Sequence, residues 1–215
     1  SYASGLDEGS LRGARIGVLR DAFGADDDPD SGQVNRVVGE AIEAMRAAGA
    51  DLAGEARTVD ALLPREGRAL DVAGGAGWDA LWLAGRGLDV TLVDVSDVAL
   101  SRAAEAAHAA GLGLRTERVD VEERPLPPGP FDVVVCLNYL WRPLFAAVAP
   151  VLAPGGWFVF CQPTRTNLQR HAHPSARFLL EDGELPGLLQ GLTPVLCTEG
   201  WSDEGRHEAR LVARR

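Results

Sequence analysis

From residue 68 onward, short apolar runs alternate with stretches of helical periodicity, and this alternation most narrowly limits the fold. The runs are too short for helices, and several are almost continuously apolar, as in strands covered on both faces. Strands joined through helices imply right-handed crossovers and an open, mostly parallel sheet, so we predict a Rossmann-like, doubly wound α/β domain. Strands are predicted at 69–73, 89–93, 114–119, 131–137 and 157–161, and helices at 77–86, 97–111 and 141–153.

The two ends of the chain depart from this alternation. Apolar runs at 193–199 and 209–214 flank a polar turn, which predicts an antiparallel hairpin at one edge of the sheet. Near the N-terminus, a strand at 14–20 precedes a helix that begins after Ser31 and ends at Gly49. This β-α unit is too small for a core of its own, so we expect it to pack on the main domain.

Charge and composition exclude several classes of function. The 215 residues include 21 arginines, no lysine and 31 acidic residues, so the net charge is −10. Residues 1–59 and 60–215 are each acidic by five charges, unlike a nucleic-acid-binding protein. No apolar run approaches the roughly 20 residues of a membrane span. The absence of lysine excludes any mechanism that needs one.

The cysteines and two of the histidines are predicted to have structural roles. Cys136, Cys161 and Cys197 lie in apolar runs, and their odd number and wide spacing fit neither a disulfide framework nor a zinc site. We expect them to be small buried hydrophobes in a reducing cytoplasm. His108 and His207 are expected to be surface or structural residues.

The most informative segment is residues 69–84, ALDVAGGAGWDALWLA. A strand ends at Asp71, a turn contains Gly74, Gly75 and Gly77, and a helix then begins. Such glycines let the backbone approach a ligand closely, while the helix N-terminus offers free N–H groups and the positive end of its dipole. Seventeen residues after Gly77 the next strand ends at Asp94, where a carboxylate suits two ribose hydroxyls.

This pattern predicts a site for a nucleoside-bearing cofactor. In the alternative reading, the glycines only form a tight turn and Asp94 only caps the helix that follows Ser96. Because Asp94 lies at a strand end and fills no core volume, its loss is expected to weaken cofactor binding and to leave folding nearly unaffected.

Two classes of cofactor compete for this site. Nicotinamide and flavin enzymes usually have an apolar strand directly before the glycines, and the helix dipole meets a pyrophosphate. Here Asp71 precedes the glycines, which is unfavourable beside a pyrophosphate but favourable beside the ammonium group of an amino-acid-bearing ligand. This favours S-adenosylmethionine over a dinucleotide. The alternatives are a nucleotide-dependent oxidoreductase and a catalytically impaired cofactor-binding module.

From about residue 61 to residue 215 the chain resembles class I S-adenosylmethionine-dependent methyltransferases, in the small bacterial group related to tellurite-resistance methyltransferases. The resemblance rests on the glycine turn, Asp94, Asp120 with Val121, FDVVVCLNYL and LAPGGWFVF. It implies a seven-stranded sheet whose last strand is inserted antiparallel. Many relatives have a basic or polar pair directly after the last glycine, where this chain has Trp78-Asp79. The family also usually has a helical segment before the first strand that helps to cover the cofactor. Here only residues 61–68 are a candidate for a remnant of that segment.

The resemblance also implies which residues bind the cofactor. They follow the first, second, third and fourth strands of the sheet. The implied set is Asp71, Ala73, Gly74, Gly75, Gly77, Asp94, Val95, Asp120, Val121, Leu137 and Asn138.

Residues 1–56 resemble a segment of amidase-signature enzymes that lies outside their catalytic core. Those hydrolases use a Ser–Ser–Lys arrangement, and this sequence has neither that core nor a lysine. We therefore expect a non-catalytic β-α segment at 1–56 and an S-adenosylmethionine-binding domain at 61–215.

Candidate residues for the substrate side follow the fourth and fifth strands. Tyr139 is expected beside the ligand crevice, with aromatic packing under the loop as the alternative. His171 lies in the polar segment 162–174 and is a candidate base, with a loop histidine that has no chemical role as the alternative. Tyr139 and His171 are the two candidates for a catalytic residue. Arg142 either holds an anionic acceptor or is a solvated surface residue. His171 and His173 lack a third ligand, so no metal site is predicted.

Methyl transfer is a displacement at a sulfonium carbon, and the cofactor carries the activation. The protein aligns the acceptor and excludes water. A thiolate or a reduced metalloid needs no base, whereas a hydroxyl usually does, so the sequence assigns no catalytic residue. We expect a cytoplasmic methyltransferase that acts on a small-molecule acceptor and binds neither nucleic acid nor membrane; its oligomeric state is left open.

Overall fold

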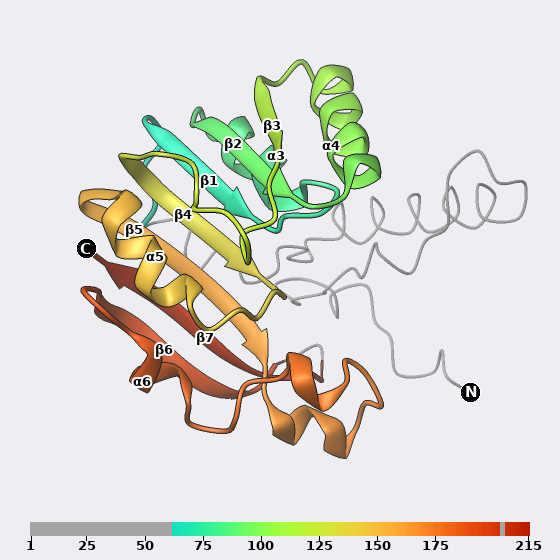
Figure 1. The fold of residues 1–215 in the computed structure, drawn as a ribbon, viewed down its shortest axis with the longest axis vertical. Coiled ribbons are helices and arrows are strands. Elements are labelled where there is room, and N and C mark those ends of the chain that lie inside the picture. Colours follow the sequence, from blue (N-terminus) through green and yellow to red (C-terminus); the bar gives the residue numbers. More distant parts are fainter. Residues whose placement is uncertain (1–61, 203–204) are drawn as a thin grey trace, which may run out of the picture. The chain divides into compact units, whose positions relative to one another are not determined.

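The computed structural model describes residues 62–202 and 205–215, and Leu63–Arg215 form one compact unit. Seven strands form a single sheet in the order β3-β2-β1-β4-β5-β7-β6 (Figure 1). Strands β1 to β5 run parallel, and β7 pairs antiparallel with both β5 and β6. This confirms the predicted α/β fold and its C-terminal hairpin. The β-α unit predicted within residues 1–56 lies outside the described residues.

The strands are β1 (Arg68–Val72), β2 (Asp89–Asp94), β3 (Leu114–Arg118), β4 (Phe131–Leu137), β5 (Leu152–Pro163), β6 (Thr193–Trp201) and β7 (His207–Arg214). The α-helices are α3 (Trp78–Gly85), α4 (Asp97–Ala109), α5 (Leu144–Val151) and the short α6 (Leu185–Leu188). The 3-10 helices η3 (Arg165–Gln169) and η4 (Ala176–Phe178) lie in the segment after β5.

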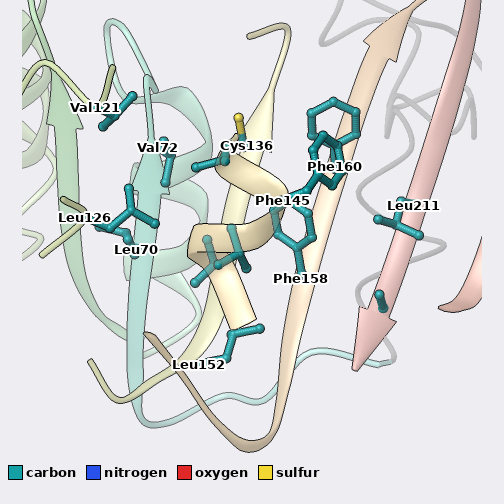
Figure 2. Close-up of a cluster of buried hydrophobic side chains, with 14 of the residues drawn as sticks. Leu70, Val72, Val121, Leu126, Cys136, Phe145, Leu152, Phe158, Phe160 and Leu211 are labelled. Atoms are coloured by element: carbon teal, nitrogen blue, oxygen red, sulfur yellow. The ribbon is translucent and has the colours of Figure 1, made fainter. Parts of the chain in front are cut away.

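The main hydrophobic core lies between the sheet and α5. Phe145 of α5 packs edge-on against Phe158 and Phe160 of β5, with ring centroids 5.9 and 4.9 Å apart (Figure 2). Leu70 and Val72 of β1 belong to the same cluster. Because side chains alternate along a strand, the residue between them, Asp71, faces the other side of the sheet, where α3 lies.

Two segments differ from the sequence prediction. Strand β5 begins at Leu152, before the predicted 157–161, because the chain around Gly155 already pairs with its neighbours: the Gly155 N–H donates to the Arg215 carbonyl, and Leu152 lies opposite Phe131. Residues 62–67, the described part of the proposed remnant of a covering helix, form turns and bends.

The prediction that all three cysteines are buried is wrong for Cys197. Cys136 on the central strand β4 is buried, and Cys161 on β5 is partly buried. Cys197 is exposed because β6 is the edge strand of the sheet and most of its residues are open to solvent. An apolar run does not distinguish an edge strand from a central one.

Candidate functional site

The turn between β1 and α3 has three residues with left-handed backbone: Ala73 (φ 55°), Gly75 (φ 55°) and Gly77 (φ 81°). A Cβ added at Gly77 would lie 2.8 Å from the Ala103 Cβ of α4, so this glycine lets two helices pack closely. A Cβ at Gly74 would collide with the Asp71 carboxylate below it. A Cβ at Gly75 would meet nothing within 4 Å, so only this glycine borders open space.

Asp71 lies beneath the turn and is 1% exposed. Its Oδ2 accepts a hydrogen bond of 3.1 Å from the Ala80 N–H in the first turn of α3. Burial raises the pKa of Asp71 well above its usual range, and the negative charges of Asp79 and Asp94 add to the shift. The other carboxylate oxygen, Oδ1, is buried without a hydrogen-bond partner. A buried acceptor of this kind is unfavourable unless a donor reaches it.

Asp94, at the end of β2, ties the turn to the sheet. Its Oδ2 accepts from the Gly75 N–H at 3.0 Å, and its Oδ1 accepts from the Ser96 N–H at 2.9 Å. Each carboxylate oxygen has a second lone pair for a further donor. The next residue, Val95, is 54% exposed. Sequence reasoning missed the bond to Gly75, although both residues belong to one β-α-β unit.

The segment after β3 approaches the end of β4 through a side-chain hydrogen bond. The Asp120 carboxylate accepts from the Glu122 N–H at 3.0 Å and so shapes the local turn, while Val121 is 5% exposed and belongs to the main core. The Tyr139 hydroxyl donates to Glu122 Oε1 at 3.0 Å. Burial raises the pKa of Tyr139, and the hydrogen bond to Glu122 adds to the rise. A phenol with a raised pKa stays protonated, so Tyr139 is a hydrogen-bond donor and a poor base.

Leu137 and Asn138 lie at the same edge of the sheet, at the end of β4. Leu137 is partly buried and pairs with Cys161 of β5, whereas Asn138 is exposed and has left-handed backbone, with φ of 58°. Asn138 Oδ1 accepts a hydrogen bond of 2.5 Å from the Arg206 guanidinium. The terminal hairpin therefore reaches the edge that carries the glycine turn and Asp94.

Other candidates on the substrate side are held by partners within the chain. Arg142 forms a two-pronged pair with Glu184, with nitrogen–oxygen distances of 2.5 and 2.7 Å, and this pairing raises its pKa. His171 Nε2 lies 2.8 Å from the Gly205 carbonyl, which only accepts, so this nitrogen carries the hydrogen and donates. The structure thus brings Tyr139 to the carboxyl edge of the parallel strands but directs His171 to the terminal hairpin.

Comparison with known proteins agrees with this architecture. Residues 69–156 match the family profile described as "Methyltransferase domain". A curated ubiquinone biosynthesis O-methyltransferase of Thiobacillus denitrificans is 36% identical over 111 residues, which are 48% of this chain and 48% of that protein. The matched segment contains the glycine turn, Asp94 and strands β2 to β4. The chain spans about half the length of the curated relatives that it matches.

Solved structures agree on the fold. An S-adenosylmethionine-dependent methyltransferase from Mesorhizobium loti superposes with a TM-score of 0.60 at 24% identity, over 76% of this chain and 98% of that one. TehB from Haemophilus influenzae gives 0.61 at 17% identity, over 74% of this chain and 60% of that one. The predicted resemblance to S-adenosylmethionine-dependent methyltransferases is confirmed for this domain.

In the described part of the chain, none of the helices combines the length and the apolar character that crossing a bilayer requires.

Proposed function

We propose that the chain transfers a methyl group from S-adenosylmethionine to a small molecule and that the accepting atom is an oxygen. The observation that carries the cofactor assignment is the bond between Asp94 and the Gly75 amide, beside a turn whose outer side is open. The oxygen acceptor is supported by the names of the curated relatives, which are O-methyltransferases.

In this proposal the cofactor lies over the turn at Gly75, and its ribose hydroxyls donate to the second lone pairs of the Asp94 carboxylate. Val95, exposed beside Asp94, offers an apolar surface for the adenine. Gly74 and Gly77 support the cofactor site indirectly. A side chain at Gly74 would collide with Asp71, and one at Gly77 would collide with α4.

The remaining residues of the proposed site lie around these groups. Ala73 continues the glycine turn, and Leu137 and Asn138 form the neighbouring strand end. Asp120 acts by shaping the loop after β3, and Val121 by packing beneath it.

Asp71 has the chemistry to receive the ammonium group of the cofactor. Its Oδ1 is a buried acceptor without a hydrogen-bond partner. An incoming positive charge would favour the ionised carboxylate and so oppose the rise in pKa to which Asp79 and Asp94 contribute. S-Adenosylmethionine, when bound, supplies a methyl group on a sulfonium centre and so brings its own activation.

The chain's part in the transfer is to orient the acceptor and to exclude water from the reacting atoms. A hydroxyl acceptor gives up its proton to the solvent as its oxygen takes the methyl group, and S-adenosylhomocysteine is released. Tyr139 serves as a hydrogen-bond donor in this proposal, because its raised pKa and its bond to Glu122 keep the phenol protonated. His171 is occupied by Gly205 and is not assigned as the base. A cytoplasmic setting agrees with the free state of all three cysteines.

The test begins with cofactor binding to the full chain. We expect S-adenosylmethionine, and not NAD, to raise the melting temperature. The full chain is then incubated with cofactor labelled in the methyl group and with a matched phenol and thiol, and the labelled product is identified. Label on the phenol oxygen is the expected result.

Each other outcome removes a defined part of the proposal. Protection by NAD alone would favour the nucleotide-dependent oxidoreductase. Binding of S-adenosylmethionine without transfer to any acceptor in a broad panel would favour the catalytically impaired binding module. Label on the thiol alone would leave a methyltransferase but overturn the oxygen acceptor.

A further inference from the structure

We propose that Asp182, Glu199 and His207 form a binding site for a divalent transition-metal cation at the hairpin edge of the sheet. One oxygen from each carboxylate and one nitrogen of the imidazole all lie within 4.8 Å of one another. The three residues come from the loop before α6, from β6 and from the start of β7. This site is separate from the proposed cofactor site and does not depend on it.

The strand register places two of these side chains together. Trp201 pairs with His207 and Glu199 pairs with Ala209, so Glu199 and His207 are diagonal neighbours on one face of the antiparallel pair. The Trp201 ring meets the His207 ring edge-on, with centroids 5.1 Å apart, and so restricts how the imidazole turns.

The two carboxylates are held in place by groups outside the cluster. Asp182 accepts from the Thr166 N–H at 3.1 Å and from the Thr166 hydroxyl at 2.6 Å. Glu199 Oε2 accepts from the Gly183 N–H at 2.8 Å. Such outer hydrogen bonds are the usual means by which proteins orient metal ligands.

A buried threonine contacts the imidazole. Thr164 is fully buried, and its hydroxyl lies 2.7 Å from His207 Nδ1. This hydrogen bond engages Nδ1 and fixes the ring on that side. In the proposal the other ring nitrogen, Nε2, binds the metal.

The donor set points to a class of cation. One imidazole nitrogen and two carboxylate oxygens suit Mn²⁺ or Zn²⁺ better than Ca²⁺, which prefers oxygen ligands alone. Ligands at metal distances of about 2.0–2.2 Å lie roughly 3–4 Å apart, so the exposed Asp182 and Glu199 side chains need only a small inward movement. Both are open to solvent, and water can complete the coordination.

A bound cation would tie the loop before α6 to the terminal hairpin. Arg206, the neighbour of His207, contacts Asn138 at the end of β4. The cation would therefore hold the hairpin where it reaches the carboxyl edge of the parallel strands.

The site is tested by titrating Mn²⁺ with the full chain and measuring free Mn²⁺ by electron paramagnetic resonance. We expect one ion per chain and a Glu199→Gln variant that binds at least about tenfold more weakly. Glu181→Gln is the matched control, because this exposed neighbouring acid pairs with Arg165 and lies outside the cluster. Its affinity should stay within about threefold of the original chain.

A second measurement separates ligation from folding. Zn²⁺ should raise the melting temperature of the original chain and of Glu181→Gln, and should raise that of His207→Gln much less. If the original chain takes up no ion stoichiometrically, or if Glu199→Gln and Glu181→Gln weaken binding equally, the site does not exist and the cations only screen surface carboxylates.

Discussion

Replacing Asp94 by alanine removes two hydrogen bonds that fix the glycine turn to the sheet. The carboxylate accepts from the Gly75 N–H at 3.0 Å and from the Ser96 N–H at 2.9 Å. The sequence alone predicted almost no effect on folding, because a side chain at a strand end fills no core volume. The structure changes that expectation, since both amides lose a charged acceptor.

The size of the effect follows from the geometry. Removing a hydrogen bond to a charged group costs about 1.5–3 kcal/mol when the site is buried. Asp94 is partly exposed, so water replaces part of each bond, and we expect a total loss of about 1–3 kcal/mol of unfolding free energy. Affinity for S-adenosylmethionine should also fall at least about tenfold, which corresponds to 1.4 kcal/mol.

Urea unfolding measures the first effect, and calorimetric titration with the cofactor measures the second. Asp97→Ala is the matched control: it removes the same charge three residues away, where an exposed pair with Arg118 contributes at most about 1 kcal/mol. If Asp94→Ala unfolds like Asp97→Ala, the two backbone hydrogen bonds do not stabilise the turn. If it binds the cofactor as the original chain does, the proposed ribose contact is wrong.

Three further predictions test the architecture of the same region. Ser96→Ala removes the hydroxyl that accepts from the Ala99 N–H at the start of α4 and should lower the unfolding free energy by about 1 kcal/mol in urea unfolding. Gly77→Ala should lower it by at least about 1 kcal/mol because of its positive φ, whereas Gly85→Ala, with open space around it, should not destabilise the chain. Burial raises the pKa of Asp71, so its stabilising protonated form is lost as pH rises from its ordinary value of 3.8 through the raised folded value. The unfolding free energy of the original chain should therefore fall relative to Asp71→Asn across that range, and parallel pH profiles would contradict this.

The parallel half of the fold was predictable because burial imposes a strong pattern on its strands. The runs around Leu70, Val93 and Val134 are almost continuously apolar and lie in interior strands of the sheet. The same criterion failed for Cys197, since β6 has an apolar sequence but lies at the edge of the sheet. Which strand lies at the edge is decided by the order of strands, which periodicity does not encode.

Glycines illustrate a second limit of the sequence. Gly74, Gly75 and Gly77 read alike as parts of a ligand-binding turn, yet only Gly75 borders open space. The other two are required by Asp71 below the turn and by Ala103 of the neighbouring helix. These contacts depend on how α3 and α4 pack together, and a single motif does not specify that packing.

The contacts on the substrate side were harder to predict from the sequence than those on the cofactor side, and the difference has a physical origin. Gly75 and Asp94 lie 19 residues apart, and the neighbouring strands β1 and β2 bring them together. Glu122 and Tyr139 lie 17 residues apart and meet through the loop after β3, although β3 and β4 are not neighbours in the sheet. Arg206 meets Asn138 across 68 residues, and this contact exists only once the terminal hairpin has docked against β5. The cofactor side therefore follows from short connections that the fold requires. The acceptor side follows from the segment after β5 and from the hairpin turn, which can change sequence without altering the sheet that holds the cofactor.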